Sequence, residues 1–147
     1  EPDRPLVFVL GAGQSRREVV RQALKVGYDN LAGELAGGAR AWEAAGLPVR
    51  RLRLVDIASV SGPVLDVRQD AEFAAGHLPG ALHVELGSVA AASLGPGPLT
   101  VMCGHGERAM SAASLLAARD GAADVAVAVG GPGDWSDGTG GSLATGV

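Results

Sequence analysis

The residue best suited to covalent chemistry in this 147-residue chain is its single cysteine, Cys103. It follows the apolar run 99–102 and opens the stretch Cys103-Gly104-His105-Gly106-Glu107-Arg108, after which an alanine-rich helix is expected. A strand that turns directly into a helix surrounds its last residue with backbone N–H groups and with the positive end of that helix. Those groups and the Arg108 guanidinium favour a thiolate over a thiol. The stretch therefore predicts a nucleophile.

The elements that must position Cys103 alternate between apolar runs and helix-forming stretches. Strands are expected at a short edge near Leu54 and Ile57, at 63–68, at 82–84, at 99–102 and at 123–129. Helices are expected at 70–74, from the cysteine turn toward Arg119, and around Trp135. This alternation predicts an α/β fold with a parallel sheet, in which ligands bind at the carboxyl ends of the strands. Cys103 stands at one such end.

The first 50 residues show a shorter version of the same pattern. Residues 6–10 and 31–35 predict strands, and the first is a continuous apolar run, which is typical of a buried parallel strand. One helix is predicted from Ser15, which forms a capping box with Glu18, to Gly27, and another at 39–45. Gly46-Leu47-Pro48-Val49-Arg50 predicts a linker. We therefore expect one domain at 1–50 and another at 51–147.

The two parts of the chain resemble each other at a spacing of about 92 residues. Gly11 faces Cys103, Arg16 faces Arg108 and, after one insertion, residues 36–42 face 129–135. Residues 1–50 are thus predicted to be a partial copy, the second half of the unit that follows. Because Gly11 takes the place of the cysteine, this copy has no thiol nucleophile.

Composition and charge exclude several classes of function. The formal net charge is −4 and the one basic cluster, at 50–53, is short, so neither nucleic acid nor an anionic membrane is an expected partner. No apolar run reaches the roughly 20 residues that a membrane span needs. One cysteine cannot form an internal disulfide, which favours a reducing, cytoplasmic location. His77, His83 and His105 fall on separate elements, so no metal site and no cofactor are predicted.

Three ordered motifs give the second part a family likeness. Residues 73–84, Phe-Ala-Ala-Gly-His-Leu-Pro-Gly-Ala-Leu-His-Val, follow Asp66-Val67-Arg68 and Glu72. The cysteine loop with its arginine comes next, and Gly130-Gly131 leads to Trp135. This order and spacing resemble the signatures of the rhodanese family, although the aromatic residue usual before the closing glycines is missing. The resemblance implies a three-layer sandwich around a central parallel sheet, preceded here by the partial copy.

The resemblance also implies a sulfurtransferase. In that family a cysteine, here Cys103, takes sulfane sulfur from thiosulfate, mercaptopyruvate or a low-molecular-weight persulfide and passes it to a thiol or another thiophilic acceptor. The loop residues that would surround the donor are Gly104, His105, Gly106, Glu107 and Arg108. Arg108 is expected to hold an anionic donor. The side chains of His105 and Glu107 either tune the choice of donor or project into solvent.

Other motif residues are predicted to support the site. Asp66 and Arg68 are expected to buttress the end of their strand, and His77 to make a structural hydrogen bond in the turn before Leu78-Pro79-Gly80. His83, on a strand, is expected to be hydrogen-bonded or exposed. Residues 27–38 and the cysteine loop also resemble the tandem rhodanese tails that follow a metallo-β-lactamase-fold domain. That likeness implies such a domain upstream in a parent protein, because this chain has no His-x-His-x-Asp-His run.

Two other functions stay open. A cysteine phosphatase or arsenate reductase uses a similar loop with five residues between cysteine and arginine, whereas this loop has four. A non-catalytic docking or regulatory module would account for the lost cysteine at Gly11. A dinucleotide site at Gly11-x-Gly13 is disfavoured because Arg16 stands where the third glycine belongs.

The partial copy carries an expectation of its own. Its strands lack the partners that a complete unit would supply, and exposed apolar strand edges tend to pair. We expect residues 1–50 either to pack on the second unit or to form a homodimer with another copy.

Overall fold

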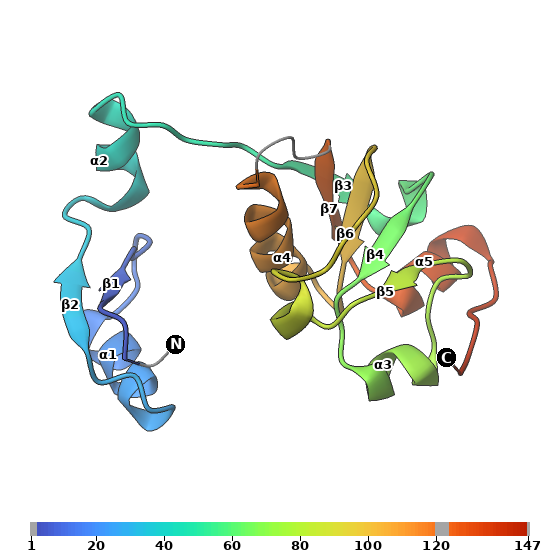
Figure 1. Ribbon diagram of the computed structural model, residues 1–147, viewed down its shortest axis with the longest axis horizontal. Coiled ribbons are helices and arrows are strands. Elements are labelled where there is room, and N and C mark those ends of the chain that lie inside the picture. Colours follow the sequence, from blue (N-terminus) through green and yellow to red (C-terminus); the bar gives the residue numbers. More distant parts are fainter. Residues whose placement is uncertain (1–2, 120–123, 147) are drawn as a thin grey trace. The chain divides into compact units, whose positions relative to one another are not determined.

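The computed structural model describes residues 3–119 and 124–146, and the chain divides into two compact units, Glu1–Arg50 (unit 1) and Arg51–Val147 (unit 2). Figure 1 shows the elements of each unit. In the described part of unit 2, five parallel strands form one sheet with the order β3-β7-β6-β4-β5. They are β3 (Arg53–Asp56), β4 (Val64–Asp66), β5 (Leu82–His83), β6 (Leu99–Met102) and β7 (Val125–Val129). The expected α/β fold with a central parallel sheet is confirmed.

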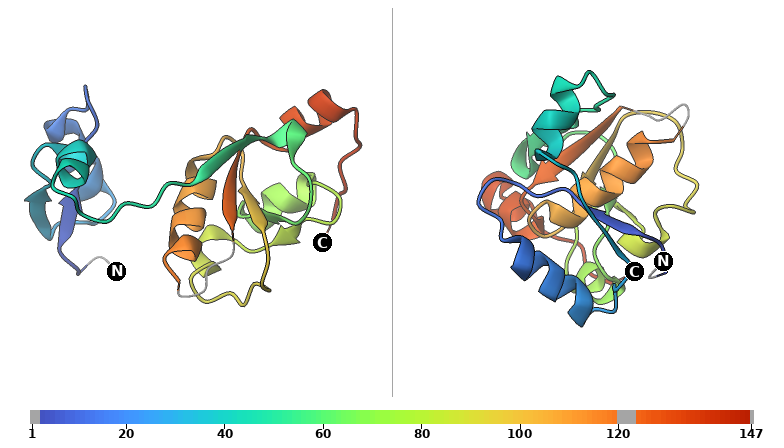
Figure 2. Two further views of the ribbon diagram at one scale, coloured as in Figure 1. Left: turned by 90° about the horizontal axis from the view of Figure 1, so that it is seen from above. Right: turned by 90° about the vertical axis from the view of Figure 1, so that its left-hand side faces the viewer.

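Helices cover both faces of this sheet. Helix α4 (Glu107–Ala117) lies on one face and α5 (Pro132–Thr139) on the other, while α3 (Asp70–Ala75) follows the carboxyl end of β4 (Figures 1 and 2). Two short 3-10 turns complete the unit, η1 (Ile57–Ser59) and η2 (Leu86–Ser88). The result is the three-layer arrangement that the family resemblance implies.

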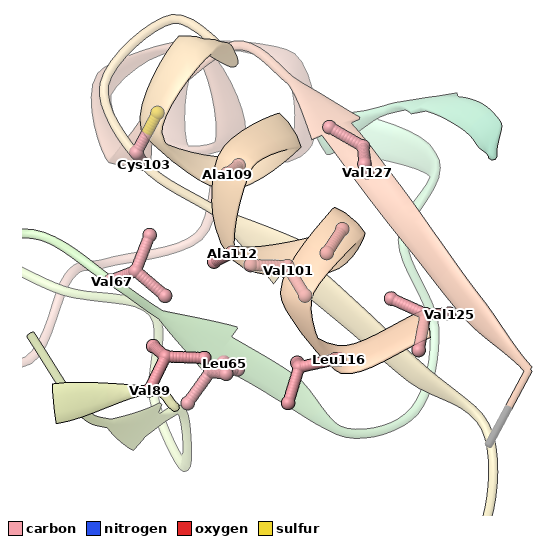
Figure 3. Close-up of a cluster of buried hydrophobic side chains, with 11 residues drawn as sticks. Leu65, Val67, Val89, Val101, Cys103, Ala109, Ala112, Leu116, Val125 and Val127 are labelled. Carbon is pink, nitrogen blue, oxygen red and sulfur yellow. The ribbon is translucent and has the colours of Figure 1, made fainter. Parts of the chain in front are cut away.

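Alternation along the strands sends neighbouring side chains to opposite faces. Val101 and Val127 pack toward α4, whereas Met102 and Ala128 belong to the cluster on the α5 side. The central strands β6 and β7 are apolar except for Thr100, as expected for strands that are buried on both faces over most of their length. Helix α4 presents apolar residues at helical spacing, four alanines and one leucine, all buried: Ala109, Ala112, Ala113, Leu116 and Ala117. Figure 3 shows this cluster, with Cys103 at one end of it beside Ala109.

Unit 1 consists of strand, helix, strand and helix. They are β1 (Leu6–Phe8), α1 (Arg16–Lys25), β2 (Leu31–Glu34) and α2 (Gly38–Ala44), and β1 pairs with β2 in parallel. Ser15 caps α1, since its Oγ accepts from the Glu18 N–H at 3.4 Å. The Glu18 carboxylate accepts from Arg21 and Gln22 instead of closing the predicted capping box.

The prediction that residues 6–10 form a buried strand is wrong. Val7 and Val9 are each 56% exposed, and the strand ends at Phe8. The described part of unit 1 has a sheet of two strands only, so no neighbour covers the second edge of β1. An apolar run reports that a strand is suited to burial, and whether burial occurs depends on the rest of the sheet.

Several element ends also differ from the expectation. Ile57 begins η1 rather than continuing the edge strand, because the Asp56 carboxylate accepts from the Ala58 N–H at 2.8 Å and turns the chain. The strand expected at 63–68 ends at Asp66, whose carboxylate accepts from the Arg68 N–H at 3.0 Å. Helix α4 ends at Ala117, two residues before Arg119. Ala123, the expected start of the last strand, lies outside the described residues. No helix in the described ranges combines the length and the hydropathy that crossing a membrane requires.

Candidate active site

Cys103 follows the last residue of β6, the middle strand of the sheet, and is 1% exposed. Its side chain sits between the apolar cluster of Figure 3 and the turn that leads into α4. Gly106, which precedes α4, has a φ of 120°, a conformation that favours glycine. This conformation folds the turn back, so that the Gly106 N–H donates to the Cys103 Sγ at 3.1 Å.

The turn lowers the pKa of the Cys103 thiol. Burial raises this pKa, because it penalises the charged form, but hydrogen bonds from four backbone N–H groups have the opposite effect and prevail. The donors belong to Ala109, His105, Gly106 and Arg108. Peptide dipoles aimed at one sulfur atom stabilise a thiolate without a general base.

Close packing holds the turn in place from the α5 side. A Cβ atom on Gly131 would lie 2.6 Å from the Gly104 carbonyl oxygen, so only glycine fits there. The Asp134 carboxylate accepts from the Gly131 N–H at 2.7 Å and fixes that residue. Gly131 therefore sets how closely α5 approaches the cysteine turn.

Arg108 joins the cysteine turn to α3. Its guanidinium donates to both carboxylate oxygens of Glu72, at 2.6 and 2.9 Å. The Glu72 carboxylate also accepts from the Gln69 N–H at 3.2 Å. The hydrogen bonds from Arg108 lower the pKa of Glu72 to about 2, and those to Glu72 raise the pKa of Arg108, with a smaller contribution from Cys103. Arg108 thus lies between a carboxylate and the cysteine sulfur.

Asp66 and Arg68 form a buried ion pair at the end of β4. Arg68 Nη2 donates to Asp66 at 2.7 Å and to the Gly76 carbonyl at 2.8 Å, and Arg68 Nε donates to the same carboxylate at 3.0 Å. Their hydrogen bonds tie the end of β4 to the segment that follows α3.

This geometry coincides with a family match: the model of the rhodanese-like domain matches residues 52–137. The chain belongs to the rhodanese-like family. Among solved structures it is similar to a rhodanese-related protein from Thermoplasma volcanium, at 19% identity over 64% of this chain and 99% of that one, with a TM-score of 0.53. It is also similar to a thiosulfate sulfurtransferase from Pseudomonas aeruginosa, at 18% identity over 99% of this chain and 33% of that one, with a TM-score of 0.51. At these identities the likeness establishes the fold. No curated protein gave a match.

In the rhodanese-like unit, two histidines enclose one phenylalanine. His77 stacks on Phe73 with ring centroids 3.7 Å apart, and His83 stacks at 4.2 Å. His77 Nδ1 lies 2.9 Å from the Phe73 carbonyl, and His83 Nε2 lies 2.9 Å from that of Arg68. The His77 backbone also pairs with Ala144. Both rings have structural contacts, as expected for His77.

The remaining loop residues of the rhodanese-like site differ in exposure. His105 and Glu107 are exposed, whereas Gly104 and Gly106 are half-buried, and the Gly106 N–H points at the sulfur. His105 lines a shallow depression of about 380 Å³ whose other described lining residues include Asp56 and Asp134. Within residues 3–119 and 124–146, no three His, Cys, Asp or Glu side chains are grouped so as to hold a metal ion.

Two contacts of the rhodanese-like site cannot be predicted from the sequence. Glu72 is recognisable as a motif residue, but its ion pair with Arg108 joins positions 36 residues apart and leaves no local pattern. The sequence signal for the contact of Gly131 with Gly104 is the Gly130-Gly131 pair. This pair indicates close packing but does not indicate which residue packs there.

The loop of unit 1 that the sequence pairs with the cysteine loop has a different interior. The Gly11 N–H donates to Oε1 of Gln14 at 2.7 Å, so a side-chain amide oxygen accepts inside this loop. Arg16 forms an ion pair with Glu34 on β2. The loop borders a hollow of about 720 Å³ that is also lined by residues of the β2–α2 turn.

Proposed function

We propose that the chain is a sulfurtransferase that carries sulfane sulfur as a persulfide on Cys103. The observation that carries the proposal is the turn of backbone N–H groups around one buried sulfur at the end of the central strand. The same groups that stabilise a thiolate stabilise the persulfide anion that replaces it. The proposed donors are thiosulfate, mercaptopyruvate or a low-molecular-weight persulfide.

The transfer takes place in two displacements. The Cys103 thiolate attacks the outer sulfur of the donor, a new S–S bond forms, and the old bond breaks so that its electron pair leaves with the remainder of the donor. With thiosulfate the leaving group is sulfite. An acceptor thiolate then attacks the outer sulfur on Cys103, which regenerates the cysteine thiolate and releases the acceptor persulfide. No oxidant or reductant is consumed.

Mass spectrometry of the intact chain tests this proposal. Incubation with thiosulfate or glutathione persulfide should add the mass of one sulfur atom to Cys103, and a thiol should then remove it. The Cys103→Ser variant is the matched control, since it keeps the turn and loses the thiol. Failure of every donor to modify Cys103 would refute the proposal. Hydrolysis of an aryl phosphate by the same protein would favour a phosphatase instead, although four residues between Cys103 and Arg108 give a narrow loop.

Exposed apolar side chains favour a second function, confined to unit 1. We propose that unit 1 is a degenerate rhodanese-like half domain, in keeping with its order of strand, helix, strand and helix. Val7, Val9, Leu24 and Val26 are each at least half exposed. Such a surface suits docking to another copy of the chain, or to a metallo-β-lactamase-fold domain in a fused parent protein.

The mass of the particle in solution tests the docking proposal. Wild-type chain should form a homodimer by light scattering, and Val9→Asp should shift it toward monomer. Val129→Asp, a change of the same kind at a valine of unit 2 that is 49% exposed, should leave the dimer intact. A monomeric wild-type chain would argue against docking between copies.

A further inference from the structure

The charges around Cys103 do not balance once its thiol is ionised. Glu72 and Arg108 neutralise each other through two hydrogen bonds of 2.6 and 2.9 Å, and the thiolate adds one negative charge. Glu72 remains ionised at neutral pH because its pKa is about 2. Arg108, the cation of the loop, is therefore already paired before a donor arrives.

Further carboxylates lie in the loop and in the depression that its His105 lines. Glu107 is exposed at the first position of α4, and Asp56 and Asp134 line the depression beside His105. Because the Cys103 sulfur is buried, the outer sulfur of a donor must enter the loop, with its charged side chains, before the thiolate can attack it. Charges at short range are weakly screened where water is partly excluded.

We propose that the site selects donors that carry little negative charge, namely organic hydropersulfides in preference to dianionic thiosulfate, and that Glu72 sets this preference through Arg108. The inference rests on the proposed sulfurtransferase function. Glu72 acts as a positioning residue, since it touches Arg108 and not the reacting sulfur.

The charges of the two donors explain why a preference for hydropersulfides over thiosulfate is expected. Attack of the thiolate on thiosulfate brings three negative charges together, and they emerge as a persulfide anion and sulfite dianion. Attack on the terminal sulfur of the protonated donor, R–S–SH, involves one negative charge, and an ionised donor R–S–S⁻ takes up a proton from water before it is attacked. The electron pair leaves as RS⁻, and the new Cys103 persulfide loses its proton to water. In both reactions Glu72 cancels the positive charge of Arg108, and the loss of that charge costs more for thiosulfate because more negative charge gathers at the sulfur.

Alkylation of Cys103 tests the charge preference without any sulfur transfer. Iodoacetamide and iodoacetate deliver the same group to a thiolate and differ by one negative charge. We expect wild-type chain to prefer iodoacetamide about tenfold more strongly than free glutathione does in the same buffer, and added salt to reduce that preference. Glu72→Gln should lower the preference several-fold. Glu34→Gln is the matched control, because it removes the carboxylate partner of Arg16 in unit 1 and should leave the preference unchanged.

Equal preference in the chain and in glutathione would overturn the inference, as would an unchanged preference in a folded Glu72→Gln variant. If that variant does not fold, the wild-type preference and its salt dependence decide the matter. A parallel comparison of kcat/KM for thiosulfate and for the hydropersulfide of 2-mercaptoethanol should favour the hydropersulfide, and a preference for thiosulfate would refute the proposal. If neither donor transfers sulfur but the chain still prefers iodoacetamide more strongly than glutathione does, the sulfurtransferase function is refuted and the charge discrimination is supported.

Discussion

The loops at Gly11 and at Cys103 each lead from a strand into a helix, the sequence predicts that they correspond, and they differ in what fills them. In unit 2 the Gly106 N–H donates to a cysteine sulfur, whereas in unit 1 the Gly11 N–H donates to the side chain of Gln14. The arginine that ends each loop is paired with a glutamate, Arg108 with Glu72 and Arg16 with Glu34. An arginine–glutamate ion pair is therefore present in each unit, whereas the backbone N–H groups that surround a sulfur are found in unit 2.

The apolar runs before the two loops differ just as clearly. Val101 is fully buried in the middle of a five-stranded sheet, whereas Val9, which the predicted repeat pairs with it, follows the end of β1 and is 56% exposed. Strands β6 and β7 pair in a continuous register, while the pairing of β1 with β2 shifts between Leu6 and Val7. A reactive turn therefore depends on the sheet that carries it as well as on its own residues.

The largest expected effect comes from moving the cysteine between units. In the double variant Gly11→Cys, Cys103→Ser, the new thiol should react with iodoacetamide like a free cysteine and should take up no sulfur from any donor. The Gln14 N–H, which the spacing of about 92 residues pairs with the Gly106 N–H, donates to the Gly11 carbonyl at 3.2 Å and not toward a side chain at position 11. The alkylation rate of the relocated thiol should therefore be about 100-fold or more below that of Cys103. Rates of alkylation and intact mass check this. Uptake of sulfur by the relocated thiol at the wild-type rate would show that the two loops are equivalent.

A smaller effect is expected at the glycines of α5. Gly131→Ala places a methyl group against the Gly104 carbonyl, which should displace the turn, lower the alkylation rate of Cys103 about tenfold and cost up to about 3 kcal/mol of stability. Gly133→Ala is the control in the same helix. A Cβ there meets nothing within 4 Å, so it should leave the reaction unchanged and stabilise the helix slightly. Equal behaviour of the two variants would mean that this contact does not position the turn.

The burial of the two valines predicts a difference in stability. Val101→Ala removes fully buried methyl groups and should lower the free energy of unfolding of unit 2 by about 2 kcal/mol. Val9→Ala should change stability by less than about 0.5 kcal/mol, because the side chain already contacts water. Urea unfolding followed by Trp135 fluorescence in a Trp42→Phe background measures Val101→Ala in unit 2, and Trp42 fluorescence in a Trp135→Phe background measures Val9→Ala in unit 1. A Val9→Ala effect as large as that of Val101→Ala would indicate that unit 1 buries this side chain in solution.

The architecture of unit 2 can be predicted from the sequence because the patterns that indicate its strands and helices are local. Continuous apolar runs, alanines at helical spacing and the glycine turns each predict their element within a few residues. The ends of strands are harder to predict. Asp56 and Asp66 end β3 and β4 through side-chain hydrogen bonds that leave no periodic pattern in the sequence. The exposure of Val9 was missed for another reason, because an apolar run does not reveal how many strands flank it. The pairing of Glu72 with Arg108 arises from the fold, which brings α3 beside α4.

The smallest expected effect concerns that ion pair and its counterpart. Glu72 has a pKa of about 2 instead of its ordinary 4.5, so the folded protein favours the ionised carboxylate. Its contribution to stability is complete above pH 4.5 and is lost as the pH falls toward 2. Because both partners are 38% exposed, Glu72→Gln should cost less than about 1 kcal/mol at pH 7, and the urea midpoints of variant and wild type should converge near pH 2. Glu34→Gln should follow the same direction, since the pKa of Glu34 is also lowered, but its partner Arg16 is more exposed and the shift should be smaller. A gap between wild type and Glu72→Gln that persists unchanged at pH 2 would show that Glu72 stabilises the unit by packing rather than by its charge.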